Sequence, residues 1–370
     1  MNTKKQAFHG SDLEKIEELY HIPRQDIAAF GSNVNPLGIS PRLRDTLAQH
    51  IDVITQYPDR DYKSLRTCIA SYTGAAAEQI IAGNGSTELI SLAMQTLHPK
   101  RACILGPTYS EYEREIGIGG GECFSFPLHP DNGFALDLDR LEPVLKSGVD
   151  LFVLCNPNNP TSSVIERAKL RELLALCAKL HILVVIDETY IEFTDSPDAV
   201  SAVSLLAEFP GLLILRGVSK FFAAPGLRLG YALCSDTALL AEMKRRQNPW
   251  TINSLAAVAG EQMFQDSEYI ARTRALISAE RERISERLCR NPHLRAFAPS
   301  ANFMLVQIAD HSMSAADFFD MAIRRGLMIR DCSTFEFLGD DYFRFCFLLP
   351  EQNDRLLACI EQAFPPVQTR

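Results

Sequence analysis

Short, almost uninterrupted apolar runs alternate with helical patterns along much of the chain. Four of these runs, at residues 102–105, 151–155, 182–186 and 212–215, consist of Leu, Ile, Val, Phe, Ala and Cys. Strands without polar alternation are buried on both faces, which is typical of parallel sheets covered by helices. The helical segments between the runs supply the crossover connections that parallel strands need. The sequence therefore predicts an α/β protein with a mostly parallel sheet.

The pattern changes near residues 248–250, and a long charged helical stretch is expected from about Leu255 to Leu288. Beyond it, short strands and helices alternate as in a small α+β domain. A chain of 370 residues is long enough for two coupled domains. We expect three parts: residues 1–40 as an N-terminal arm packing with the small domain, residues 41–255 as a large domain, and residues 256–370 as the small domain.

Composition narrows the functions to consider. The formal net charge of −9 disfavours a general role in binding nucleic acid or an anionic membrane. The ten cysteines contain no CxxC pair, so we expect buried thiols in a reducing compartment, with neither a disulfide framework nor a metal site. No apolar run is long enough to span a bilayer, and the first residues lack the apolar core of a signal peptide. A cytoplasmic protein is the expectation.

Lys220 follows the apolar run 212–215 and is the residue around which the predicted site is organised. A lysine just past such a strand lies at the carboxyl end of the sheet, where open α/β sheets place ligands. When desolvated, a lysine has a lowered pKa and can form a Schiff base with a carbonyl compound. Ser219 and Arg228 add a hydroxyl and a fixed cation, which suit a phosphate group. Taken alone, a lysine after one strand is more often a solvated loop residue.

Polar groups at other predicted elements favour a ligand-binding role for Lys220 over that of a solvated loop residue. They follow strands, or they begin a helix after a glycine-rich turn, where backbone N–H groups bind anions. They are Asn159, Asp187 and Tyr190 after strands, and Gly85, Ser86 and Thr87 at the helix start. With Lys220 they meet the needs of pyridoxal phosphate: an amine for the aldehyde, a carboxylate for the pyridine nitrogen, donors for the phenolate oxygen and an anion site for the phosphate.

The order and spacing of these groups resemble those of the fold-type I pyridoxal-phosphate enzymes in the class I/II aminotransferase superfamily. The resemblance rests on Asn-Pro-Asn-Asn-Pro-Thr at 156–161, Asp-Glu-Thr-Tyr at 187–190, Ser-Lys at 219–220 and Gly-Leu-Arg-Leu-Gly at 226–230. It implies a large cofactor-binding domain with a mostly parallel seven-stranded sheet covered by helices. It also implies these roles: Lys220 carries the Schiff base, Asp187 pairs with the pyridine nitrogen, Asn159 and Tyr190 bind the phenolate oxygen, Tyr109 stacks on the ring, and Gly85, Ser86, Thr87, Ser219 and Arg228 surround the phosphate.

Two residues outside these motifs are assigned through the same resemblance. Tyr57 matches a tyrosine that reaches the cofactor phosphate from a neighbouring subunit, which implies a homodimer with shared active sites. Arg344 matches the arginine that binds the substrate α-carboxylate. No metal ion is implied.

Within the superfamily, the chain resembles the threonine-phosphate decarboxylases of cobalamin biosynthesis and the histidinol-phosphate aminotransferases. The dipeptide at 9–10 and the segments at 30–38 and 329–332 favour the decarboxylases, whereas Ser-Asp at 11–12 departs from the Gly-Asn of that family. The expected reaction is decarboxylation of L-threonine O-3-phosphate, a small phosphorylated amino acid, to (R)-1-amino-2-propanol phosphate. The expected substrate contacts are His9, Asn33, Asn159, Arg330 and Arg344.

Three alternatives stay open at this point. Decarboxylation of O-phospho-L-serine to ethanolamine phosphate involves a substrate that lacks one methyl group, a difference that pockets discriminate by only ~1–3 kcal/mol. An aminotransferase of the histidinol-phosphate type would use the same residues to break a different bond at Cα. A non-catalytic regulator that binds pyridoxal phosphate is disfavoured, because the sequence shows no basic nucleic-acid-binding extension.

Overall fold

The computed structural model describes residue 10 and residues 12–365 of the chain. A seven-stranded sheet forms the centre of its larger part, in the order β1-β7-β6-β5-β4-β2-β3. Strand β7 runs antiparallel to β1 and β6, and the other adjacent pairs are parallel. The predicted α/β class with a mostly parallel seven-stranded sheet is therefore confirmed. The strands are β1 Ile80–Gly83, β2 Arg101–Gly106, β3 Glu122–Pro127, β4 Leu151–Cys155, β5 Leu183–Asp187, β6 Leu212–Gly217 and β7 Gly230–Cys234.

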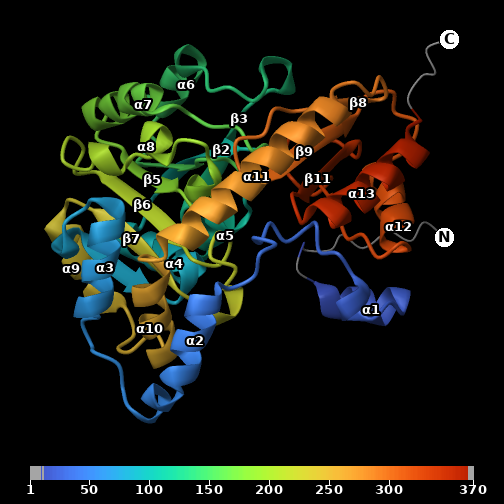
Figure 1. Ribbon diagram of the computed structural model, residues 1–370. Coiled ribbons are helices and arrows are strands. Elements are labelled where there is room, and N and C mark those ends of the chain that lie inside the picture. The colour runs from blue at the N-terminus through green and yellow to red at the C-terminus, as the bar shows by residue number, and fades with distance from the viewer. Residues whose placement is uncertain (1–9, 11, 366–370) are drawn as a thin grey trace.

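The apolar runs in the sequence form the inner strands of this sheet. Every residue of β4 and β6 is buried, because helices pack against the sheet (Figure 1). Strand β3 was not predicted as a strand. It lies at the edge of the sheet and is only partly buried, so its sequence does not form a continuous apolar run.

Helices connect the strands of this sheet and cover it (Figure 1), and we call the sheet with its helices the large domain. Among the described residues, no helix is both long enough and apolar enough to cross a membrane. The helices of the large domain are α2 Pro41–Gln49, α3 Lys63–Thr73, α4 Gly85–Leu97, α5 Glu111–Ile118, α6 Leu138–Leu145, α7 Arg167–Lys179, α8 Pro197–Val200, α9 Thr237–Arg246 and α10 Ser254–Met263.

The single helix expected over residues 255–288 is wrong, because the structure has two helices there. Helix α10 ends at Met263, and α11 runs from Ser267 to Leu288. The side chain of Asp266 accepts a hydrogen bond from the backbone N–H of Tyr269 at 3.2 Å, so it caps a new helix. Helix α10 packs against α2 and α3 of the large domain, whereas α11 extends from there to the second sheet (Figure 1). The boundary expected at residue 256 thus falls inside α10.

The second sheet has four antiparallel strands in the order β10-β11-β9-β8. Helices α12 Ala315–Ile323 and α13 Pro350–Ala363 lie beside it, and α1 Leu13–Tyr20 lies nearby (Figure 1). We call this sheet with α12 and α13 the small domain. Its strands are β8 Leu294–Ala296, β9 Phe303–Ile308, β10 Arg330–Asp331 and β11 Tyr342–Cys346.

Residues 28–35, which we call the connecting segment, are bonded to both domains. The backbone N–H of Cys346 in the small domain donates to the Phe30 carbonyl at 2.8 Å. Five residues later, the N–H of Asn35 donates to the Lys220 carbonyl of the large domain at 3.0 Å. The segment therefore fixes the N-terminal part of the chain at the junction of the two domains.

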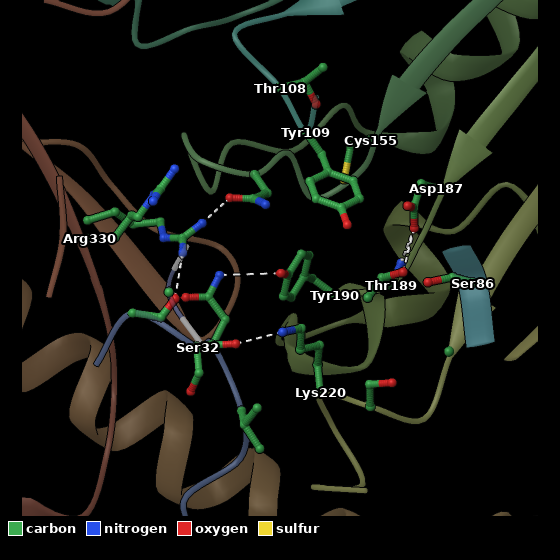
Figure 2. A pocket seen from close by; sticks show the side chains of 18 of the residues that line it. Ser32, Ser86, Thr108, Tyr109, Cys155, Asp187, Thr189, Tyr190, Lys220 and Arg330 are labelled. Atoms are coloured by element: carbon green, nitrogen blue, oxygen red, sulfur yellow. Dashed lines mark hydrogen bonds between the residues drawn. The ribbon is translucent and has the colours of Figure 1, made fainter. Parts of the chain in front are cut away.

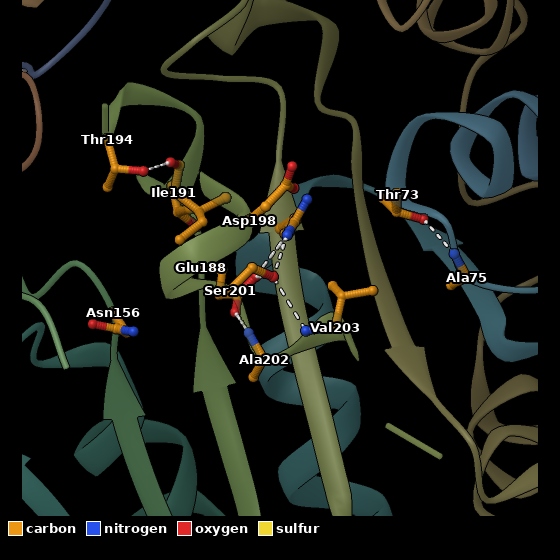
Figure 3. Close-up of polar contacts among 12 residues, drawn as sticks. Thr73, Ala75, Asn156, Glu188, Ile191, Thr194, Asp198, Ser201, Ala202 and Val203 are labelled. Atoms are coloured by element: carbon orange, nitrogen blue, oxygen red, sulfur yellow. Dashed lines mark hydrogen bonds and ion pairs between the residues drawn. The ribbon is translucent and has the colours of Figure 1, made fainter. Parts of the chain in front are cut away.

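A buried ion pair joins the ends of β5 and β6. Arg216 Nη2 lies 2.8 Å from Glu188 Oε2, and both side chains are buried. The same carboxylate accepts from Ser201 Oγ at 3.0 Å and from the backbone N–H of Ala202 at 2.6 Å (Figure 3). Because a buried carboxylate needs such partners to stay ionised, this network fixes the strand ends that carry the site.

Candidate active site

A cavity of about 770 Å³ lies at the carboxyl ends of the large-domain strands and extends to the small domain. Open α/β sheets place their ligands at this edge. Most of the predicted site residues line the cavity, although they come from segments far apart in the sequence. Those that line it are Asn33, Ser86, Thr87, Tyr109, Asn159, Asp187, Tyr190, Ser219, Lys220, Arg228, Arg330 and Arg344.

Lys220 follows β6 and points into the cavity (Figure 2). Its Nζ donates a hydrogen bond to the carbonyl oxygen of Ser32 at 2.6 Å. Burial lowers the pKa of the Lys220 amine from 10.5 to about 8, and the positive charges of Arg344 and Arg228 act in the same direction. A lysine with such a pKa is partly neutral near neutral pH, so it can act as a nucleophile or as a proton carrier.

Asp187 is the last residue of β5 and is buried beside the cavity. Burial raises the pKa of its carboxyl, and hydrogen bonds to the carboxylate oppose that effect. Thr189 donates to Oδ1 from its hydroxyl at 2.6 Å and from its backbone N–H at 2.9 Å, and Tyr112 donates to Oδ2 at 2.8 Å. Tyr112 and Thr189 were not predicted as site residues. A sign of each is visible in the sequence: Tyr112 follows Tyr109 closely at the start of a helix, and Thr189 is two residues after Asp187, where a hydroxyl can close a turn.

A candidate anion site lies where α4 begins. Gly85 has a φ of +82°, and a Cβ there would lie 2.5 Å from Arg228 Nη2. A Cβ on Gly230 would lie 2.7 Å from the Gly85 carbonyl carbon. The two glycines therefore allow β7, the first turn of α4 and the Arg228 guanidinium to approach closely. The hydroxyls of Ser86, Thr87 and Ser219 line the cavity beside this cluster, whereas Gly85 itself does not line it.

Tyr190 and Arg344 are linked to the connecting segment. Asn33 Nδ2 donates to the Tyr190 hydroxyl at 3.3 Å, and burial raises the pKa of Tyr190. Arg344 is buried and donates through Nη1 to Asn159 Oδ1 and through Nη2 to the Gly31 carbonyl at 2.8 Å. Asn33 Oδ1 and Arg344 Nε are buried with no hydrogen-bond partner among the described residues. Such groups are expected to bind a ligand, since unpaired buried polar atoms are costly.

Arg330 lies opposite Arg344 in the register of β10 and β11. Its Nη2 donates to Thr334 Oγ1 at 2.9 Å, and its guanidinium carbon lies 5.6 Å from the centre of the Phe335 ring. Burial lowers the pKa of Arg330, and the nearby charge of Arg344 lowers it further. Arg330 lies across the cavity from Asp187 (Figure 2).

Among the described residues, two of the predicted site residues, Gly85 and Tyr57, do not line this cavity. Tyr57 is 80% exposed, and its ring centre lies 4.7 Å from that of Trp250, so within its own chain it lies on the surface. This location is compatible with the expected contact to a neighbouring subunit, which stays a prediction. His9 lies outside the described residues.

The fold, the lysine after β6 and the carboxylate at the end of β5 define a fold-type I pyridoxal-phosphate enzyme. Residues 25–360 match the family described as Aminotransferase class I and II, and the chain belongs to this family. Pyridoxal phosphate is the cofactor of this family.

The chain is similar to two kinds of enzyme within the family. It is 34% identical over 352 residues to the threonine-phosphate decarboxylase of Salmonella typhimurium, covering 95% of each chain. It is 31% identical to the histidinol-phosphate aminotransferase of Clostridium acetobutylicum, whose crystal structure it matches with a TM-score of 0.84 over 90% of this chain and 98% of the other. A histidinol-phosphate aminotransferase from Sinorhizobium meliloti, solved in complex with pyridoxal 5'-phosphate, shares the fold at 20% identity, with a TM-score of 0.82 over 95% of this chain and 94% of the other.

The residues around the cavity fit this cofactor. The first turn of α4, the Arg228 guanidinium and the hydroxyls of Ser86, Thr87 and Ser219 lie together beside the cavity, as a bound phosphate requires. Asn33 Oδ1, beside Tyr190, is buried without a hydrogen-bond partner among the described residues, so it can accept a hydrogen bond from a polar ligand. Lys220 donates to a backbone carbonyl, and no described carboxylate pairs with it, so its amine can react with an aldehyde.

Proposed function

We propose that this protein decarboxylates L-threonine O-3-phosphate to (R)-1-amino-2-propanol phosphate, the linker precursor in cobalamin biosynthesis. The observation that carries the proposal is the pairing of Arg330 with Arg344. They are directly opposite in adjacent antiparallel strands, so both side chains project from the same face of the sheet, and both line the cavity. Two adjacent guanidinium groups suit a substrate with two anionic groups, a carboxylate and a phosphate. The similarity to a threonine-phosphate decarboxylase supports the same reaction.

In this proposal the cofactor is held by Lys220, by Asp187, by the anion site at the start of α4, and by Tyr109, Tyr190 and Asn159. When bound, it supplies a ring that accepts electrons from a bond at the substrate Cα.

The remaining steps belong to side chains of the chain itself. Arg344 binds the carboxylate and Arg330 binds the phosphate, so the two arginines orient the substrate and determine which bond at Cα breaks. After carbon dioxide has left, Lys220 Nζ can protonate Cα, because its pKa of about 8 allows it to carry a proton near neutral pH.

The second candidate is transamination of histidinol phosphate, favoured by the 31% identity to a histidinol-phosphate aminotransferase. Histidinol phosphate has a phosphate but no carboxylate, so it would engage one of the two arginines. The other arginine would then bind only the acceptor of the amino group, a dicarboxylate such as 2-oxoglutarate. Decarboxylation of O-phospho-L-serine stays a third candidate, because loss of one methyl group changes binding by only ~1–3 kcal/mol.

One assay separates these candidates. The loaded enzyme is incubated with O-phospho-L-threonine, O-phospho-L-serine or histidinol phosphate, with and without 2-oxoglutarate, and carbon dioxide and carbonyl product are measured separately. We expect carbon dioxide from phosphothreonine, without carbonyl product and without need for an acceptor. Carbonyl product that depends on 2-oxoglutarate would overturn the decarboxylase proposal in favour of transamination. Faster release of carbon dioxide from phosphoserine would change the assigned substrate.

We also propose a homodimer in which Tyr57 contributes to the site of the other subunit. What supports this is that Tyr57 is 80% exposed and lies outside the cavity of its own chain. The Tyr57→Ala and Lys220→Ala variants should each be nearly inactive. Mixed by unfolding and refolding together, they should regain partial activity, because a mixed dimer contains one site with both residues intact. No recovery from the mixture would count against shared sites.

A further inference from the structure

The Asp187 carboxylate accepts three hydrogen bonds from the described part of the chain, and they are unevenly shared between its oxygens. Oδ1 receives both bonds from Thr189, and Oδ2 receives the single bond from the Tyr112 hydroxyl. A carboxylate can accept about four hydrogen bonds, two on each oxygen. One acceptor position on Oδ2 is therefore left, on a residue that lines the cavity.

The surroundings of Asp187 oppose its negative charge. Among the described residues no cation forms an ion pair with it, and the carboxylate is buried. The titratable groups that face it are acidic or neutral: Glu188 next to it in the chain, which is paired with Arg216, the Cys155 thiol on the neighbouring strand β4, and the phenols of Tyr109, Tyr112 and Tyr190. Hydrogen bonds from Thr189 and Tyr112 are thus the main interactions that counter the effect of burial, which raises the pKa of Asp187.

Tyr112 is well placed for this role. It lies in the first turn of α5 and is fully buried, so its hydroxyl needs an acceptor, and Asp187 Oδ2 is that acceptor. Its ring lies edge-on to that of Tyr109, with 5.7 Å between ring centres. The same turn of the chain thus carries the aromatic ring that lines the cavity and the hydroxyl that orients the carboxylate.

We propose that Tyr112 and Thr189 are positioning residues that hold Asp187 ionised and direct its free Oδ2 position toward the pyridine nitrogen of the cofactor. This inference rests on the role of Asp187 in cofactor binding and is independent of which substrate is used. A purely structural role for Tyr112, as one more buried aromatic residue, is the alternative to be excluded.

The test uses Tyr112→Phe and Thr189→Val, which remove one hydroxyl each and keep the size of the side chain. The affinity of the cofactor-free protein for pyridoxal phosphate is measured across pH. In the same cofactor-free proteins, the protonation of Asp187 is followed by infrared titration, with Asp187→Asn identifying its band. Both readouts require no substrate and no turnover.

Because each hydroxyl stabilises the ionised form, its loss should raise the pKa of Asp187. Each variant should bind the cofactor about tenfold more weakly near neutral pH, as expected for loss of one hydrogen bond to a charged group. The acid limb of the affinity profile should move to higher pH. Tyr231→Phe is the matched control, because Tyr231 is buried on β7 but does not line the cavity, and it should leave both readouts unchanged.

Two results would overturn the proposal. One is a wild-type Asp187 titration and a wild-type cofactor affinity in both Tyr112→Phe and Thr189→Val. The other is an equal change in Tyr231→Phe, which would identify a general packing effect. If the substrate assay failed while these shifts were observed, the decarboxylase proposal would be wrong and the positioning roles would stand.

Discussion

The two sides of the cavity are built from different kinds of contact. The cofactor side, around Lys220 and Asp187, comes from turns that directly follow neighbouring strands of one sheet. The substrate side, around Arg330 and Arg344, comes from the small domain and is bonded to the connecting segment, more than 300 residues earlier in the chain. The cofactor side is thus positioned by one sheet. The substrate side depends on how β10, β11 and the connecting segment pack together.

This difference indicates that the large domain positions the cofactor and the small domain selects the substrate. Chemistry that is common to the family needs fixed groups, and a sheet edge supplies them. Substrate choice needs groups that can change without disturbing the cofactor, and a second domain supplies those. Four substitutions and one pH profile, from the largest expected effect to the smallest, test whether the two sides can be separated in this way.

Lys220→Ala should give the largest effect. Without the amine, turnover should fall by about 10³-fold, as for loss of a group that transfers protons, and the absorbance band of the lysine Schiff base should disappear. Lys169→Ala, an exposed lysine on α7, is the control and should behave as wild type. A Lys220→Ala protein that keeps the Schiff-base band would contradict the role of this lysine.

Arg216→Met should affect stability while leaving the chemistry of the cofactor side intact. It leaves the buried Glu188 carboxylate without its ion-pair partner, which is expected to lower the free energy of unfolding by about 3–5 kcal/mol. Urea unfolding measures the change. Arg287→Met, which removes a largely exposed ion pair with Glu361, should change it little. A loss of cofactor binding by folded Arg216→Met would place this ion pair within the site.

Arg344→Met should reduce kcat/KM by about a hundredfold, because it removes one member of a buried, hydrogen-bonded set of polar groups. Cofactor affinity should fall much less than kcat/KM, since among the residues proposed to hold the cofactor only Asn159 is described as hydrogen-bonded to Arg344. Steady-state kinetics and cofactor titration on the same preparation measure the two effects. If cofactor affinity fell as far as kcat/KM, the two sides would not be separable.

Arg330→Met should raise KM for phosphothreonine by about tenfold, as expected when one charge-assisted contact is lost. The value of kcat should change less, because the proposed contact is remote from Cα. Arg287→Met serves again as the control for loss of an arginine outside the cavity. An Arg330→Met enzyme with an unchanged KM would exclude it from the phosphate pocket.

The smallest effect concerns pH. The uptake of pyridoxal phosphate by the cofactor-free protein should become faster as pH rises through about 8, because burial lowers the pKa of Lys220 and only its neutral amine reacts. The Arg344 cation contributes to this lowering, so Arg344→Met should move the midpoint to higher pH, by less than about one unit. Stopped-flow absorbance measures the midpoint. A wild-type midpoint near 10.5, the ordinary value, would indicate a solvated lysine.

The cofactor side could largely be predicted from the sequence, because each of its residues follows or precedes an element with a strong local pattern. Asp187 directly follows the apolar run 182–186, Lys220 lies a few residues after the run 212–215, and Gly85 marks the start of a helix. Only the neighbours of Asp187 were missed. A tyrosine in the first turn of a helix, such as Tyr112, usually belongs to the core, and no local pattern shows that its hydroxyl meets a carboxylate 75 residues later.

The geometry of the substrate side could not be predicted in the same way. Arg330 and Arg344 were assigned by resemblance, but their direct pairing depends on the register of two short strands. The hydrogen bond from Lys220 to Ser32 joins positions 188 residues apart, and no spacing rule reaches that far. The break between α10 and α11 was also missed, because helical periodicity continues past Asp266 and outweighs one capping residue.

The hydrogen bond from Lys220 Nζ to the Ser32 carbonyl links cofactor binding to the connecting segment. A Schiff base at Nζ would leave at most one N–H on that nitrogen, so this bond would be weakened or lost, while the backbone bond from Asn35 to Lys220 would stay in place. The connecting segment would then be held by one tether fewer on the large-domain side and by the same bonds on the small-domain side. Amide hydrogen exchange in residues 28–35 should therefore differ between the cofactor-free and loaded protein before any substrate is added. Hydrogen exchange in the connecting segment would thus indicate how much of the protein carries the cofactor.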